Sequence, residues 1–312
     1  MARREAADTV QRNLRRAQKR EVALWESKLL FADEICAGVL PMLMRDLRAG
    51  GRPDLDTMTE RLSAFLPLPF ADPTEEEEGV IGVCLAASNG AFIAECCYKL
   101  SRMLENAVKK KNLLQFVLDA ETDGKPQTVA MLNANTFSEI FSAMQKKTKG
   151  LTAVFGQSFA EVIEQVGEGS ADACLLPVEN NRDGVLISVW KSICAEDLFI
   201  SRIFIKNDSS GINAKFALLC RGFFSIIESS ENLLLYLRLV YNAAFHRLLT
   251  VLSVLHVDLR STFSIPLTYT DGNAQICAFC GTNAALFSLL FWLRMMKVDA
   301  TLLGICTEEG EE

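Results

Sequence analysis

A carboxylate and two carboxamides, Glu179-Asn180-Asn181, come directly after the apolar run at residues 174–178. Such a run is typical of a buried strand, and Gly184 then leads into a second apolar run. In open α/β sheets, ligand crevices lie outside the carboxyl ends of the strands. The sequence therefore predicts hydrogen-bonding groups at a ligand-binding edge of a sheet. The alternative is that these polar side chains only cap the end of the strand.

Composition limits the class of protein. The chain has 312 residues, half of them hydrophobic, which allows two or three domains with a proper core. A net charge of -7 argues against a nucleic-acid binder, because such surfaces are usually basic. The ten cysteines lie in apolar runs, and the pair Cys277 and Cys280 has no second pair at zinc-ligand spacing. We therefore expect buried free thiols in a reducing compartment.

The chain carries no apparent targeting or membrane signal. Its N-terminus is charged from Arg3 onward without an apolar segment behind it, and the longest apolar run, residues 284–293, is too short to span a bilayer. We expect a cytoplasmic protein with no membrane or nucleic-acid partner.

The first part of the chain, residues 1–119, reads as helical. Apolar residues recur at helical spacing over 5–48, where Pro41 predicts a kink or a boundary, and a second helix is expected at 54–65. Thr74 and Glu77 form a capping box that opens a third helix, expected to reach about residue 118. This pattern predicts an all-α domain.

Strands and helices alternate in the second part, residues 126–221, which predicts an α/β sheet. From residue 222 to 312 the pattern is β-α-β-β-α-β, the ferredoxin-like split motif. The six elements of this last part are expected at residues 223–227, 242–255, 261–267, 274–279, 282–296 and 300–305.

Several segments, in this order, resemble one family. Residues 52–61 resemble the loop and second helix of the all-helical chorismate mutases, and residues 133–139 and 179–184 resemble prephenate dehydratase motifs. Residues 242–249 and 256–266 resemble phenylalanine-sensing ACT domains. The whole chain is thus similar to the bifunctional chorismate mutase–prephenate dehydratases, or P-proteins. The resemblance implies a helical mutase-like domain, a truncated α/β dehydratase-like domain and a ferredoxin-like ACT domain.

The mutase reaction needs fixed cations, because its substrate carries two carboxylates and its ether oxygen gains negative charge. By resemblance, four remnants of the mutase set are Lys19, Asp56, Glu60 and Ser88. Four positions depart from the family, namely Cys36, Leu47, Thr59 and Phe92. Arg45 or Arg48 could compensate by a register slip. Asp56 and Glu60 could instead be ordinary carboxylates at a helix start.

The dehydratase reaction expels hydroxide and carbon dioxide, so it needs a hydroxyl donor near the leaving group. The resemblance assigns the dehydratase-like remnants to Glu179, Asn180, Asn181, Lys215 and Phe216. The donor threonine of the family is replaced by Ala214, and Lys215 lacks the bidentate fork of arginine. Much of the family's second lobe is also missing between residues 206 and 213.

The ACT resemblance implies an effector site for phenylalanine. The residues that it assigns to this site are Ala243, Ala244, Phe245, Ser264 and Pro266. Phe263 and Ile265 replace an acid and an arginine, so contacts to an amino acid's ammonium and carboxylate are lost. The alternative is a dimerisation module that binds nothing small.

Two functions stay open. The first is an enzyme with impaired catalysis in L-phenylalanine biosynthesis, converting chorismate to prephenate and phenylpyruvate. The second is a pseudoenzyme that acts as a dimeric scaffold or regulatory partner. An unrelated helical interaction protein is a third, weaker reading. The resemblance implies a homodimer in either of the first two, with chorismate or prephenate as substrate if the protein is active. It implies no cofactor and no metal, because the rearrangement and the elimination need only placed charges and a proton donor.

Overall fold

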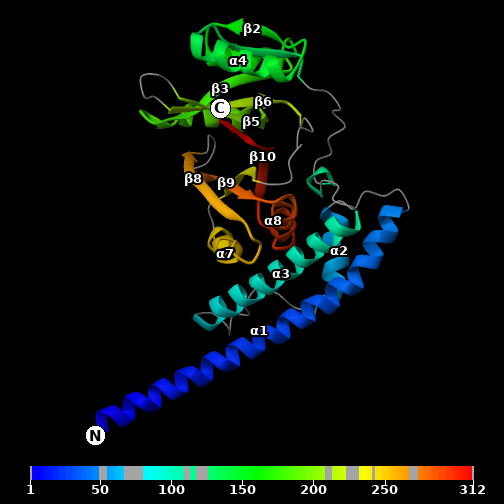
Figure 1. The fold of residues 1–312 in the computed structure, drawn as a ribbon, viewed down its shortest axis with the longest axis vertical. Coiled ribbons are helices and arrows are strands. Elements are labelled where there is room, and N and C mark those ends of the chain that lie inside the picture. Colours follow the sequence, from blue (N-terminus) through cyan, green and yellow to red (C-terminus); the bar gives the residue numbers. More distant parts are fainter. Residues whose placement is uncertain are drawn as a thin grey trace.

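A computed structural model describes residues 2–48, 55–66, 80–108, 113–116, 126–207, 213–222, 232–240, 243–266 and 273–310. An N-terminal helical region packs beside a mixed α/β sheet, and the first half of the first helix projects away from the rest of the molecule (Figure 1).

The helical region contains α1 (Ala2–Arg48), α2 (Leu55–Phe65) and α3 (Val80–Ala107), followed by a short 3-10 turn, η2 (Leu113–Phe116). Helix α1 continues through Pro41 without ending there, so of the predicted kink or boundary the boundary is wrong. Its buried stripe, Ala32, Cys36, Val39 and Leu43, follows the three–four spacing of a helix face and packs in one core with α3.

The sheet joins the two C-terminal parts of the chain. Its strands follow the order β2-β1-β3-β6-β5-β10-β7-β9-β8, with β4 beside β3 and β11 beside β5. The elements of its first half are β1 (Thr128–Leu132), α4 (Asn135–Lys147), β2 (Thr152–Gly156), α5 (Phe159–Gly167), β3 (Ala173–Asn180), β4 (Gly184–Val185), α6 (Ile187–Ala195), β5 (Phe199–Asn207) and β6 (Asn213–Cys220).

The second half has the predicted β-α-β-β-α-β order. Its elements are β7 (Leu233–Val240), α7 (Ala243–Val251), β8 (Asp258–Pro266), β9 (Asn273–Gly281), α8 (Asn283–Met295) and β10 (Ala300–Cys306), and the short β11 (Glu308–Gly310) follows. The last strand, β10, lies parallel to β5 at Gly304 and Ile200, so a continuous sheet crosses from one half to the other.

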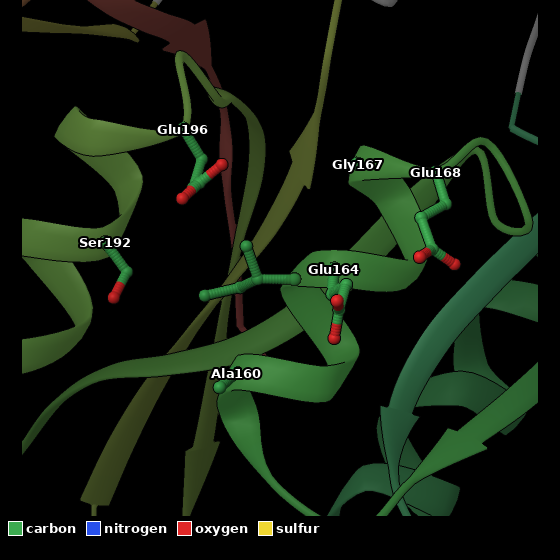
Figure 2. Close-up of a pocket in the computed structure, with 7 residues that line it drawn as sticks. Ala160, Glu164, Gly167, Glu168, Ser192 and Glu196 are labelled. Carbon is green, nitrogen blue, oxygen red and sulfur yellow. The ribbon is translucent and has the colours of Figure 1, made fainter.

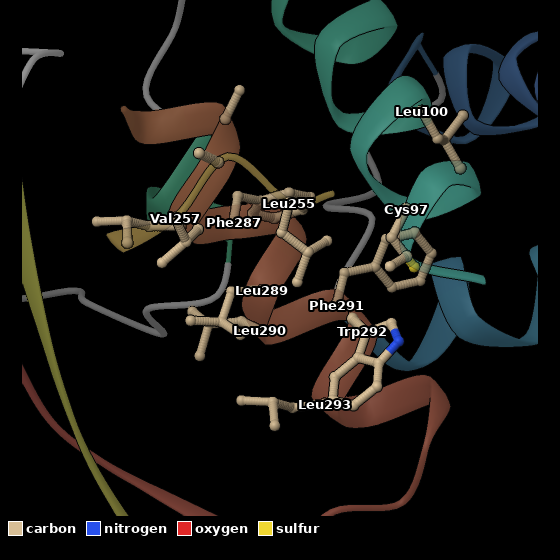
Figure 3. Packing of buried hydrophobic residues seen from close by; sticks show 14 of the residues in the cluster. Cys97, Leu100, Leu255, Val257, Phe287, Leu289, Leu290, Phe291, Trp292 and Leu293 are labelled. Carbon is tan, nitrogen blue, oxygen red and sulfur yellow. The ribbon is translucent and has the colours of Figure 1, made fainter. Parts of the chain in front are cut away.

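Alternate residues of β7 enter different cores, as the two-residue period of a strand requires. Leu235 and Leu237 face α3 and α8, whereas Leu234 and Tyr236 face a core that also holds residues of α5 and α6. Figure 3 shows Cys97 and Leu100 of α3 close to Phe291 and Trp292 of α8. A third core lies under α4. The helical region is therefore packed onto the second half of the sheet.

One further element prediction is wrong, and another falls outside the described residues. Helix α3 ends at Ala107 and not near residue 118, because Leu113 and Leu114 turn back into the core beside α8. The backbone N–H of Leu114 donates to Asn283 Oδ1 at 3.3 Å. The first strand of the last part is β7, whereas the predicted segment at 223–227 lies outside the described residues. A continuous apolar run such as 233–237 has no strand period to recognise, because both of its faces are buried.

Candidate functional site

The polar residues at the end of β3 build a turn. Asn180 Oδ1 accepts hydrogen bonds from the backbone N–H groups of Arg182 and Asp183 at 2.9 and 2.6 Å, while its Nδ2 donates to Asp183 Oδ2 at 3.0 Å. Asn181 Oδ1 accepts from the N–H of Asn213 at 3.1 Å. Gly184 completes the turn with a φ of 72°. The acceptor oxygens of both carboxamides are therefore engaged with the backbone.

Lys215 lies on β6 directly opposite Glu179 of β3. Its Nζ is 3.5 Å from Glu179 Oε2 and 3.3 Å from Glu308 Oε1, which comes from β11. Two carboxylates of the chain itself thus neutralise the one cation of the dehydratase-like set. Phe216 points to the other face, where it is buried and packs edge-on against Phe137 with ring centroids 5.2 Å apart. The strand separates Phe216 from Lys215.

The interior of the helical region is apolar where the mutase resemblance calls for cations. Cys36 is fully buried, and its thiol donates to the carbonyl of Cys96 at 3.4 Å. Phe92 is buried and stacks with Phe31 at a centroid distance of 6.0 Å. A hydrogen bond with Cys36, together with burial, raises the pKa of the Cys96 thiol far above its ordinary value. A dianionic substrate has no counter-charge among these side chains.

The charged remnants of the mutase-like set do not meet one another. Asp56 is ion-paired with Arg294 of α8, and Glu60 is exposed. Lys19 lies on the projecting half of α1. The contact of α1 with α2 is at Asp46, which is about 40 Å further along the helix at 1.5 Å of rise per residue. Arg45 and Arg48 are exposed. The side chains of Ser88 and Leu47 lie outside the part that the structure describes.

Two of the five effector-like residues, Ser264 and Pro266, lie on β8, which ends the strand order of the sheet. Ser264 and Pro266 are exposed, and the side chain of Gln275 donates to Ser264 Oγ at 2.7 Å. Phe263 packs edge-on against Trp190 of α6 at 5.0 Å, and Ile265 is 2% exposed in the same core. The two replacements therefore form an apolar contact between the halves of the sheet. The side chains of Ala243, Ala244 and Phe245 lie outside the described residues.

A cavity of about 430 Å³ opens between α5 and α6, away from these residues. Figure 2 shows Glu164 of α5 and Glu168 just after this helix on one side, and Ser192 of α6 and Glu196 just after that helix on the other. Three carboxylates make this cavity unsuited to a dicarboxylate such as prephenate. Across the described ranges, no group of three or more His, Cys, Asp or Glu side chains could hold a metal ion, and no described helix is long and apolar enough to cross a membrane.

Four residues at the site were not anticipated from the sequence, namely Glu308, Glu309, Arg202 and Lys147. Glu308 and Glu309 of β11 ion-pair with Lys215, Arg202 and Lys147, which come from three other elements. The available signal was the acidic segment Glu308-Glu309 directly after the apolar strand of residues 300–306. A segment this short does not identify its own partner strand, since β5 lies about a hundred residues earlier.

No family model matches the sequence, and no curated protein matches it. Among solved structures, a prephenate dehydratase from Streptococcus mutans is similar at 17% identity and a TM-score of 0.49, over 58% of this chain and 98% of that chain. GqqA, a quorum quenching acylase, is similar at 18% identity and 0.45, over 59% and 96%. A prephenate dehydratase from Arthrobacter aurescens in complex with L-Phe is similar at 13% identity and 0.45, over 58% and 89%.

Proposed function

We propose that the chain is a non-catalytic relative of the chorismate mutase–prephenate dehydratases and acts as a dimeric scaffold or regulatory partner in L-phenylalanine biosynthesis. The observation that carries this proposal is the state of Lys215. Glu179 and Glu308 both lie within 3.5 Å of its Nζ, and Ala214 beside it has no proton to give to a leaving hydroxyl. A substrate carboxylate would have to displace two carboxylates of the protein.

The helical region supports the same proposal. Cys36 and Phe92 stand at two positions of the resembled mutase site. Both are buried, and they contribute a thiol and a phenyl ring. Placing a dianion there would require desolvating two charges without a compensating cation, which is strongly unfavourable. Chorismate mutase activity is therefore not part of the proposed function.

The projecting half of α1 supports a homodimer. A lone helix in water is marginally stable, and this one leaves four large apolar side chains 58–65% exposed. Those four residues are Val10, Leu14, Val22 and Leu24. Residues 10–20 hold five cations and no carboxylate, whereas residues 21–34 hold four carboxylates and one lysine. Antiparallel pairing with a second copy places the basic half against the acidic half.

The activity proposal is tested by giving the purified protein chorismate and, separately, prephenate. We expect neither substrate to be consumed and no phenylpyruvate to form. Prephenate formed from chorismate would overturn the proposal for the helical region, and phenylpyruvate would overturn it for the α/β region. An informative variant restores the family residues as Ala214→Thr with Lys215→Arg. It should stay inactive, because Glu179 and Glu308 remain in place to pair with the new guanidinium.

A further inference from the structure

The last described strand, β11, is held to the sheet from both of its faces. It pairs in parallel with β5, with Glu308 opposite Ile203 and Glu309 opposite Phe204. The backbone N–H of Ile203 donates to the carbonyl of Thr307 at 3.2 Å. Because successive side chains of a strand point to opposite faces, Glu308 and Glu309 reach different cations. Figure 1 places the C-terminal end of the chain beside β5 and β6.

Each carboxylate of β11 has a cationic partner on the first half of the sheet. Glu308 is 3.3 Å from Lys215 Nζ on one face. On the other face, Glu309 Oε1 is 3.0 Å from Arg202 Nη1 and its Oε2 is 2.8 Å from Lys147 Nζ. The Arg202 side chain is 14% exposed, so this pair is the least solvated of the three. The edge of β5 therefore pairs with the backbone of β11, while cations beside this edge pair with its two adjacent carboxylates.

The attachment of β11 is weak by its length. Three residues form few ladder hydrogen bonds, and Lys215, Glu308 and Lys147 are each more than a third exposed, so water screens their ion pairs. Strand β5 has nine residues, and β10 pairs with β5 in register only at Ile200. Departure of β11 would therefore leave the edge of β5 around residues 203–205 open, with three cations beside it.

We propose that β11 is a releasable acidic strap on a peptide-binding edge of β5, and that an extended segment of a partner protein with two adjacent carboxylates takes its place. The partner strand would add to the sheet through main-chain hydrogen bonds, the mode called β-augmentation. Its two carboxylates would pair with Arg202 and Lys147 on one face and Lys215 on the other, and such charge-assisted contacts select acidic segments.

The test uses the full chain and a fluorescent peptide of sequence Thr-Glu-Glu-Gly-Glu-Glu, the sequence of residues 307–312. The variant Glu308→Gln with Glu309→Gln loosens the strap but keeps its length, and its fold is checked by circular dichroism. We expect the double variant to bind the peptide at least tenfold more tightly than the wild type does. The Ile203 amide should also exchange with deuterium at least tenfold faster in the double variant.

Two controls, both made in the double variant, decide the outcome. Adding Arg202→Gln should reduce peptide binding at least tenfold, whereas adding Arg102→Gln should leave it unchanged, because Arg102 lies on α3 and pairs with Glu105 of the same helix at 3.4 Å. A peptide with glutamine at every glutamate position should not bind. Equal binding by wild type and double variant, or equal loss from both added changes, would overturn the proposal.

Discussion

At the residue scale, the positions where this sequence differs from the motifs that it resembles are packing positions. Cys36, Phe92 and Ile265 are all less than 5% exposed, and Phe263 contacts Trp190. An apolar side chain at such a place stabilises the fold by roughly 25 cal/mol per Å² of apolar surface removed from water. These four side chains therefore contribute to the stability of the cores.

Ile265 gives the sharpest test of this packing role. Ile265→Ala should lower the free energy of unfolding by roughly 2–5 kcal/mol, because it leaves a cavity in the core shared with Trp190. The matched control is Ser264→Ala at the exposed neighbour, which should change stability by about 0.5 kcal/mol or less. Urea unfolding measures both variants. Similar losses in the two would contradict the packing role of position 265.

The buried thiols predict a loss of stability at alkaline pH. Burial raises the pKa of Cys220 from 9.0 to about 12, so above pH 9 the unfolded chain releases a proton that the folded chain keeps. Ionisation then favours the unfolded state, and stability falls by about 1.4 kcal/mol per pH unit for this one thiol between pH 9 and 12. Cys220→Ala should show a shallower decline over this window and a parallel course below pH 8. Identical slopes above pH 9 would refute the assignment.

At the element scale, the crossing of β10 and β5 joins the two halves of the sheet. A Cβ built on Gly304 would lie 2.3 Å from the carbonyl oxygen of Ile200 and 2.6 Å from its Cβ, so only glycine fits. The element order around this crossing could be predicted from the sequence, since helix and strand periods differ. The pairing of β10 with β5 could not, because it depends on backbone approach between strands a hundred residues apart.

A substitution at Gly304 tests the pairing of β10 with β5, and a substitution at Gly90 serves as the control. Gly304→Ala should destabilise the protein by roughly 1–3 kcal/mol through overpacking. Gly90→Ala lies within helix α3, where an added Cβ meets Trp292 at an ordinary 3.8 Å, and it should stabilise by up to about 1 kcal/mol through helix propensity. Thermal unfolding followed by circular dichroism measures both. A neutral effect at Gly304 would mean that the two halves are not held together at this point.

At the scale of the whole molecule, the chain combines an N-terminal helical region with a mixed sheet whose second half has the β-α-β-β-α-β order. This architecture was predictable because long helices, capping residues and alternating elements are local signals. The candidate site was predictable only as a set of residues. That Asn180 and Asn181 form a turn, that Phe216 faces the other side of the sheet, and that Glu308 meets Lys215 all depend on tertiary pairing.

The oligomeric state should depend on the exposed apolar residues of α1 and on salt. Val10→Glu with Leu14→Glu should shift the proposed dimer toward monomer in analytical ultracentrifugation, because these two exposed residues are four apart and so lie on one face of the projecting helix. Ala23→Glu adds the same charge on the opposite face and should leave the dimer intact. Raising salt should weaken the dimer, since screening reduces attraction between its basic and acidic halves. A monomer at all concentrations would contradict the dimeric scaffold.

The measurement that tests the central claim most directly is calorimetric titration of prephenate into the wild-type protein, since it detects binding without requiring turnover. The account predicts no saturable heat, because Glu179 and Glu308 already neutralise Lys215 and the buried side chains packed around Cys36 are apolar. Saturable binding of prephenate that disappears in Lys215→Met would contradict it, and would show that the dehydratase-like residues still form a working substrate site.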